Sequence, residues 1–431
     1  MKTELQNYSI FPKVVPAGRS VRIRIAPRGA HAAFDPEAEY LLRFMPLQEN
    51  VEPLGLEAYP SAVLRSEGGE LSFERAFVGE QEHYVRIYRL PDRKVETVQL
   101  SLYSLPPDLY ERRPLRGDTH AHSSYSDGKE YPDIVAANYR KAGYDFMAIT
   151  DHERWEPSGI AARAFAGFPV DLRIFPGEEV HAPGNHIHIV AFGGDWSVNE
   201  LFRRDKAAYR REVLALMAER EVPPGVDAFE YAACRWVFDR IREAKGLGVF
   251  VHPHWISKVY HVPDRMTERL FENAPFDAFE LIGGHPQISN NLQTAFYNDA
   301  RARGLRIPIV GASDSHGTIN GEWFDRMYTI VFALGDGKDD IVEAVKGLYS
   351  VAVEHYEGEH YRVYGPYRLV KFAIFLLEEY FPIHDELCFE EGRLMKELAC
   401  GDPEAAAALG RLSGRTAALL DSCFGTLAVK A

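Results

Sequence analysis

The stretch that decides the fold is residues 116–128, which read RGDTHAHSSYSDG. His120 and His122 are two residues apart, so on an extended strand both side chains point to the same side of the backbone. Asp127 can return to that side after a short turn. Two spaced histidines alone are also compatible with a solvated or hydrogen-bonded pair, because imidazole is not only a metal ligand. The rest of the chain has to decide between these interpretations.

Similar polar clusters recur downstream, each at an end of an apolar run that is typical of a buried strand. The runs cover residues 146–149, 172–175, 187–192, 249–251 and 307–310. The clusters are Thr150-Asp151-His152, Gly177-Glu178-Glu179, His186-Ile187-His188, Val251-His252-Pro253-His254 and Ser313-Asp314-Ser315-His316. Helical patterns over 132–142, 229–244 and 289–303 separate most of the runs. This alternation predicts an α/β fold with parallel strands, whose C-terminal ends carry the functional residues.

Composition narrows the classes of protein that fit. The 431 residues are 46% hydrophobic, which is ample for two or three domains. A net charge of −14 argues against an extended nucleic-acid-binding surface. The N-terminus lacks a signal-peptide pattern and no run of about 18 apolar residues is present, so we expect a cytoplasmic protein without a membrane partner. The four cysteines contain no Cys-x-x-Cys pair, so neither a zinc knuckle nor a dithiol site is predicted.

Three segments are predicted. Residues 1–112 alternate polar and apolar residues between Gly and Pro turns, which favours a small all-β, sandwich-like domain. Residues 113–353 carry the strand–helix alternation and all the polar clusters. A long connection at about 195–245 is expected to form a helical cap over the mouth of the site. Residues 354–431 lack strand patterning and are expected to form a helical C-terminal extension.

The ordered motifs resemble those of the polymerase-and-histidinol-phosphatase (PHP) superfamily. They are Asp118-Thr119-His120-Ala121-His122 with Ser126-Asp127-Gly128, Ile149-Thr150-Asp151-His152, Pro176-Gly177-Glu178-Glu179, His252-Pro253 and Ser313-Asp314-Ser315-His316. The resemblance covers about residues 116–350. It implies a distorted (β/α)7 barrel that binds two or three divalent ions and hydrolyses phosphoesters. Arg116-Gly117-Asp118 and the β-rich N-terminal segment also look similar to a metallohydrolase branch that includes a carbaryl esterase.

The resemblance implies nine metal ligands. One ion would be held by His120, His122, Glu179 and Asp314, a second by Glu179, His188 and His252, and a third by Asp127, His152 and His316. Asp127 stands where many members of the superfamily have a histidine, which makes the third position harder and more anionic. Imidazole and carboxylate ligands suit Zn, Mn or Fe, and no thiolate is present to favour zinc.

The neighbours of these ligands have alternative roles. His188 is preferred to His186 as a ligand, and His181 and His285 are expected to be structural or solvated. Glu178 is expected to accept hydrogen bonds outside the ligand set. Asp151 either orients a ligand or forms a turn.

Candidates for the chemistry follow the ligand motifs. His254 is the candidate general acid, with lining of the pocket as its alternative role. Arg154 and Lys258 are candidates to bind anionic oxygens of the substrate, with simple solvation as the alternative. Trp155 and Trp255 could wall the site or serve only in packing.

The function predicted is that of a metal-dependent hydrolase, favoured as a phosphoesterase acting on a small phosphorylated metabolite or nucleotide. A metal-bridging hydroxide would be the nucleophile. The same centre could instead hydrolyse a carboxylic or carbamic ester. A third alternative is a catalytically idle metal-binding sensor or scaffold, whose β-rich N-terminal segment binds a partner.

Overall fold

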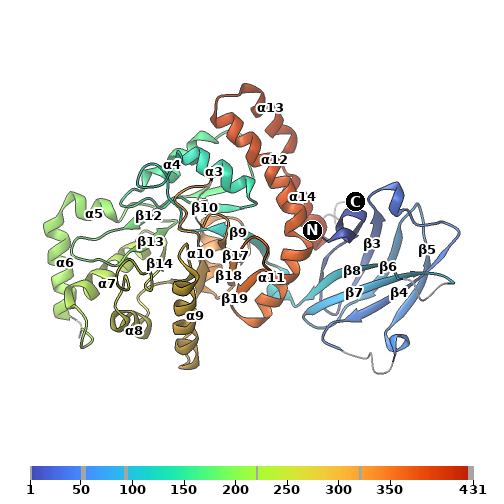
Figure 1. Ribbon diagram of the computed structural model, residues 1–431, viewed down its shortest axis with the longest axis horizontal. Helices are drawn as coiled ribbons and strands as arrows, with labels where there is room; N and C mark the ends of the chain where they lie inside the picture. Colours follow the sequence, from blue (N-terminus) through green and yellow to red (C-terminus); the bar gives the residue numbers. More distant parts are fainter. Residues whose placement is uncertain (1, 50–54, 92–95, 220–221, 320–322, 426–431) are drawn as a thin grey trace. The chain divides into compact units, whose positions relative to one another are not determined.

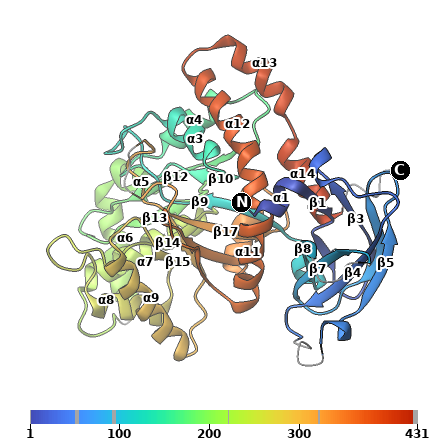
Figure 2. The same cartoon turned by 45° about the vertical axis from the view of Figure 1, so that its right-hand side comes forward.

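The computed structural model describes residues 2–49, 55–91, 96–219, 222–319 and 323–425 (Figures 1 and 2). The chain divides into two compact units. The first comprises Met1–Arg113, Tyr367–Leu387 and Gly414–Ala431, and the second comprises Pro114–Pro366 and Cys388–Ser413. The division after Arg113 lies one residue beyond the expected limit of the N-terminal domain. The segment predicted as a separate extension, 354–431, is shared between the two units.

The first unit contains two β-sheets that share one core. A three-stranded sheet has the order β1-β3-β6, with β1 at Tyr8–Phe11, β3 at Ser20–Pro27 and β6 at Leu71–Ala76. A five-stranded sheet has the order β2-β8-β7-β4-β5, with β2 at Val14–Pro16, β8 at Glu96–Leu105, β7 at Gln81–Arg89, β4 at Glu39–Pro46 and β5 at Ser61–Arg65. Alternate residues of both sheets, such as Ile23, Ile25, Val85 and Ile87, are buried in this core.

Helices complete the first unit. They are α1 (Thr3–Asn7), α2 (Pro107–Tyr110), α11 (Tyr367–Glu379), the start of α12 (Phe381–Ala399) and α14 (Arg415–Phe424). Lys13 Nζ lies 2.9 Å from Glu379 Oε2, and the two side chains are only 2% and 5% exposed. This buried ion pair therefore joins the N-terminal strands to a helix that lies more than 350 residues later in the chain.

The second unit holds two further sheets. One has the order β11-β10-β9-β17-β18-β19, with β9 at Arg113–Asp118, β10 at Phe146–Ala148, β11 at Arg173–Phe175, β17 at Met327–Ala333, β18 at Ser350–Glu354 and β19 at Arg362–Tyr364. The other has the order β12-β13-β14-β15-β16, with β12 at Gly177–Val180, β13 at Ile189–Phe192, β14 at Leu247–Phe250, β15 at Ala278–Ile282 and β16 at Ile309–Gly311. All five predicted apolar runs overlap a strand.

The α/β class is confirmed, but the strands do not form seven strand–helix repeats. Strands β9, β10 and β11 are parallel, as are β14, β15 and β16, whereas β12–β13, β13–β14 and β17–β18 are antiparallel. Only eight residues join β12 to β13, which is too short for a crossover helix. The expected absence of strands after residue 354 is wrong for β19, a three-residue strand too short to show periodicity.

Helices flank these sheets in the second unit. They are α3 (Pro132–Lys141), α4 (Glu156–Ala164), α5 (Asn199–Arg204), α6 (Lys206–Glu219), α7 (Ala228–Glu243), α8 (Asp264–Asn273), α9 (Gln287–Ala302), α10 (Lys338–Lys346), the later part of α12, and α13 (Pro403–Leu412). The connection expected as a cap forms α5, α6 and α7, which Figure 1 shows beside β12, β13 and β14. Their buried side chains join the core over these strands. Within the described parts of the chain, no helix is long and apolar enough to cross a membrane.

The ion pair between Lys13 and Glu379 can be tested by a double-mutant cycle. We expect Lys13→Met alone to destabilise the protein by roughly 1.5–3 kcal/mol, because the buried Glu379 carboxylate loses one charged hydrogen bond and keeps only Lys2, whose Nζ lies 3.0 Å from Oε1. Lys13→Met combined with Glu379→Met should recover most of that loss, since both charges are then removed. Denaturant unfolding of the three proteins measures the effect. A double variant less stable than either single variant would contradict the assignment.

His83 makes stability depend on pH. Burial, with a smaller contribution from Arg75, lowers the pKa of His83 to about 4 from an ordinary value near 6.5. The unfolded chain therefore binds the proton more tightly, and the stability due to the neutral ring is lost as pH falls from 6.5 through 4. Between pH 7 and pH 4.5 we expect wild type to lose roughly 2–3 kcal/mol more than His83→Gln in denaturant unfolding. Parallel pH profiles for the two proteins would contradict this expectation.

Candidate metal centre

The two histidines of the first motif follow the end of β9 and lie beside the residues that follow β16. The backbone N–H of His122 donates to Ser315 O at 2.9 Å, and that of Asp314 donates to His120 O at 2.9 Å. These hydrogen bonds flank a parallel bridge between Ala121 and Ser315, and another parallel bridge joins His152 to Glu179. These contacts place four of the polar motifs side by side, although up to 196 residues separate their members.

Four side chains converge on the first predicted cation position. Asp314 Oδ1 lies 3.0 Å from His122 Nε2 and 3.3 Å from His120 Nε2, and Glu179 Oε2 lies 3.6 Å and 3.5 Å from the same two nitrogens. Ligand atoms about 2.0–2.2 Å from one cation are separated by roughly 3–3.5 Å, so this spacing suits a single ion. All four side chains are buried.

The second position shares Glu179 with the first. Glu179 Oε1 lies 2.7 Å from His188 Nδ1 and 3.5 Å from His252 Nε2. The two oxygens of one carboxylate thus face two different sets of imidazoles. This geometry is the one expected of a bridging ligand.

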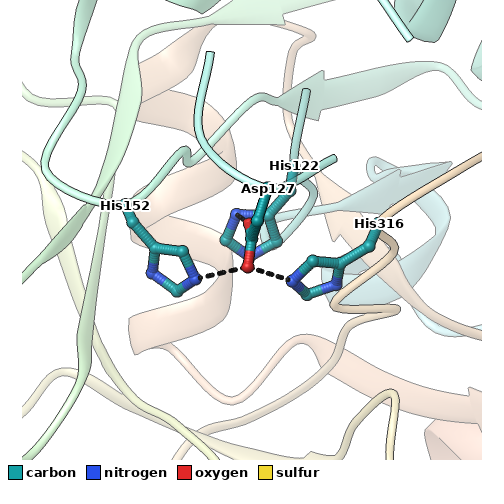
Figure 3. Close-up of side chains that lie close together, drawn as sticks. All are labelled: His122, Asp127, His152 and His316. Atoms are coloured by element: carbon teal, nitrogen blue, oxygen red, sulfur yellow. Dashed lines mark ion pairs between the residues drawn. The ribbon is translucent and has the colours of Figure 1, made fainter. Parts of the chain in front are cut away.

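The third group surrounds Asp127 (Figure 3). Asp127 Oδ2 lies 3.4 Å from His152 Nε2 and 3.2 Å from His316 Nε2, with one imidazole on either side of it. His122 Nδ1 lies 3.8 Å from Asp127 Oδ1, so this ring faces both the first and the third group. The structure therefore brings all nine predicted ligands into one continuous cluster.

The turn that presents Asp127 is fixed by Asp151. Asp151 Oδ1 accepts hydrogen bonds from Ser123 N at 2.7 Å and from Ser126 Oγ at 2.6 Å. Gly128 follows Asp127, and a Cβ atom there would lie 2.7 Å from the backbone of His122. A larger residue would push this turn away from the first motif.

Buried polar atoms in the cluster fit a bound cation. Neither Glu179 oxygen nor His120 Nε2 has a hydrogen bond of acceptable geometry within the described parts of the chain. A buried carboxylate needs compensation, because removing its charge from water is costly. The imidazoles and carboxylates that face one another at these spacings are ligands that divalent zinc, manganese and iron accept. The residues present therefore fit the metals that the resemblance implies.

Carboxylates and burial set the protonation of the imidazoles when no cation is bound. Burial acts to lower the pKa of His152, but Asp127 and Glu179 outweigh it and raise that pKa to about 10. Burial dominates at His252 and lowers its pKa to about 4. The carboxyl pKa of Asp314 is held below its usual range because His120 and His122 outweigh the effect of burial. Cations at this cluster would compete with protons at rings such as His152.

Glu280 is a buried carboxylate that the sequence analysis did not single out. It lies within β15, and its Oε2 is 2.9 Å from His120 Nδ1. Burial raises the pKa of Glu280 to about 7, although His120 acts in the opposite direction. A hydrogen bond at Nδ1 leaves Nε2 of His120 directed at Asp314 and Glu179, so Glu280 orients this ligand.

Glu178 points away from the ligand cluster, as its position next to Glu179 on a strand predicts. Its carboxylate accepts hydrogen bonds from Ser197 Oγ at 2.7 Å and from Asn199 Nδ2 at 2.9 Å. It thereby anchors the start of α5 to β12.

A cavity of about 330 Å³ opens onto the cluster, a size typical of small-molecule sites. Seven predicted ligands line it, together with Lys129, Trp255, Gly284, His285 and Trp323. His285 is buried, and its Nε2 lies 3.6 Å from Asp314 Oδ2. Lys129 and Trp323 were missed by the sequence analysis. Lys129 could have been found in the sequence only from its position directly after the Asp127-Gly128 turn.

The candidate general acid and substrate-binding residues lie elsewhere. His254 Nε2 is 3.6 Å from Asp264 Oδ1, and its ring packs on Tyr260 and Phe296. Arg154 pairs with Glu156 at 3.6 Å, and Lys258 is exposed. None of the three is among the described residues that line the cavity, so their roles stay predictions without geometric support.

The role of Glu280 is testable by metal binding. We expect Glu280→Gln to weaken binding of Zn²⁺ roughly 10- to 100-fold at one position, because it disturbs the orientation of His120 without removing a ligand. Competition with a chromophoric chelator measures the affinity. Glu178→Gln is the matched control, since it alters another buried carboxylate that contacts no predicted ligand side chain. Equal affinities in the two variants would contradict the role.

Comparisons with known proteins give matches to parts of the chain. No family model matches the chain. The sequence is 33% identical over 92 residues to the DNA polymerase/3'-5' exonuclease PolX of Bacillus subtilis (strain 168), a match that covers 21% of this chain and 16% of the polymerase. The matched segment is thus a small part of that protein.

Two solved structures are similar to parts of this chain. A two-domain protein of Bacteroides vulgatus ATCC 8482, which contains a predicted PHP-like metal-dependent phosphoesterase, is 19% identical with a TM-score of 0.39 over 58% of this chain and 67% of that chain. An amidohydrolase of Chromobacterium violaceum, with bound sulfate and no metal, is 20% identical with a TM-score of 0.31 over 47% of this chain and 87% of that chain. The description of the Bacteroides protein names the PHP type of phosphoesterase, the superfamily that the ordered motifs of this chain resemble.

Proposed function

We propose that this protein is a metal-dependent hydrolase whose substrates are phosphoesters of small molecules. The observation that carries the proposal is the buried carboxylate of Glu179, whose two oxygens face separate sets of imidazoles. A ligand that bridges two cations is the arrangement that suits hydrolysis by paired metals.

His120, His122, Glu179 and Asp314 would hold one cation, and Glu179, His188 and His252 would hold a second. Asp127, His152 and His316 would hold a third. The cations would supply Lewis acidity, lowering the pKa of the attacking water and stabilising negative charge on the scissile group. No protein nucleophile is then required.

Lys129 supports an anionic substrate. It lines the cavity beside Asp127, and its ammonium group forms no ion pair with the residues that the structure describes. An ammonium group in this position can bind a phosphoryl oxygen by a charge-assisted hydrogen bond. The cavity volume of about 330 Å³ favours a small metabolite or nucleotide over a polymer.

Hydrolysis of a carboxylic or carbamic ester is the second candidate. Trp255 and Trp323 both line the cavity, and two indole rings supply apolar surface that a neutral ester could contact. The ligand cluster serves either reaction, so Lys129 distinguishes the two candidates.

The test compares 4-nitrophenyl phosphate with 4-nitrophenyl acetate, using protein loaded separately with Mn²⁺ and Zn²⁺. We expect faster turnover of the phosphate and its loss in Asp314→Ala. Lys129→Gln should raise KM for the phosphate roughly tenfold or more, because a charged hydrogen bond of about 1.5–3 kcal/mol is lost. Its effect on the acetate should be small.

Two outcomes would redirect the proposal. Preference for the acetate, with no effect of Lys129→Gln on the phosphate, would favour the ester hydrolase. Metal binding without Asp314-dependent turnover of either compound would favour the idle sensor or scaffold.

A further inference from the structure

The loop between β14 and α8 returns a third histidine to the second cation position. The chain leaves the site after His252 and comes back through two backbone hydrogen bonds, from His261 N to Trp255 O at 2.8 Å and from Val262 N to Pro253 O at 3.0 Å. His261 is therefore held beside His252 although nine residues separate them.

The ring of His261 faces the imidazoles of the second position. Its centroid lies 4.4 Å from that of His188 and 5.3 Å from that of His252. The ligand nitrogens that the three rings offer lie within 4.8 Å of one another. The Nε2 atom of His261 accepts only a long contact, at 3.4 Å, from the backbone N–H of His188. A cation could replace that contact at little cost.

We propose that His261 is a further ligand of the second cation, which it would hold together with His188 and His252, with Glu179 approaching the same position through its contacts with those two imidazoles. This inference rests on the proposed function, because it requires a cation at the cluster, but it does not depend on which ester is hydrolysed. Three nitrogens and one carboxylate oxygen form a set that suits tetrahedral zinc. The first position offers two nitrogens and two oxygens. The second position is therefore richer in imidazole, and we expect it to prefer zinc over manganese more strongly than the first position does.

The loop that carries His261 also forms part of the cavity wall. Trp255 lines the cavity and accepts the hydrogen bond from His261 N, while Ile256, Val259 and Tyr260 are 43%, 74% and 37% exposed. A cation bound by His261 would therefore tie the end of this loop, and through the hydrogen bond to Trp255 O the cavity wall, to the metal centre.

The test is metal binding by the full chain after removal of all metal. Zn²⁺ affinity is measured by competition with a chromophoric chelator, and the coordination of Co²⁺ by its visible absorption. We expect His261→Ala and His261→Gln to lower the affinity for one Zn²⁺ ion roughly tenfold or more. Both variants should also reduce the visible absorption of tetrahedral Co²⁺. His188→Ala is the positive reference. His186→Ala is the matched control, since it removes an exposed imidazole that belongs to none of the ligand groups.

Hydrogen exchange supplies a readout independent of affinity. Zn²⁺ should protect the amides of His261 and Val262 in wild type and in His186→Ala, and the protection should be lost in His261→Gln. If the His261 variants match His186→Ala in both measurements while His188→Ala loses a cation, the inference is wrong and the proposed function stands. If His188→Ala and Asp314→Ala also keep every cation, the proposed function itself fails.

Discussion

The structure around the site depends on one buried charge, the carboxylate of Glu179. It is fully buried on β12, and its oxygens lie within 4 Å of imidazoles that follow β9, β10 and β14 or precede β13. A lone carboxylate in such a place would be protonated or would unfold the site, because desolvation penalises the charged form. Here the surrounding imidazoles outweigh burial and hold the pKa of Glu179 well below its usual range. Protons or cations must therefore accompany this group. The imidazoles that carry those protons or bind those cations reach Glu179 because the ends of these strands converge.

Much of this site could be predicted from sequence because its residues follow short apolar runs. A run such as 146–149 has to be a buried strand, so the polar residues after it, including His152, have to lie at a strand end. The order of the motifs along the chain then assigns His120 and Asp314 to one site, through the resemblance to the superfamily. No local pattern connects these two positions. Helices were predicted equally well where end signals are strong, as at α3, which begins with Pro132 and is followed by Gly143 in a left-handed conformation.

The remaining features could not be predicted because they depend on contacts between distant segments. Glu280 lies inside an apolar strand, and only the approach of His120 across the fold gives its carboxylate a function. His261 lies in a loop that matches none of the motifs, and two backbone hydrogen bonds bring it back to the site. The division of the C-terminal helices between the two units also leaves no signal, because buried faces of helices in either unit have the same composition.

The charges of the cluster bear on the kind of substrate it can accept. The nine predicted ligands include three carboxylates, those of Asp127, Glu179 and Asp314, and the remaining six are neutral imidazoles when they bind metal. Two divalent cations would bring four positive charges, which balance these three carboxylates and a bound hydroxide, and a third cation would leave the centre positive. Lys129 adds another positive charge at the cavity wall. A protein with a net charge of −14 would thus hold a locally positive cavity, and an anionic phosphoester is the class of ester that this field attracts most strongly.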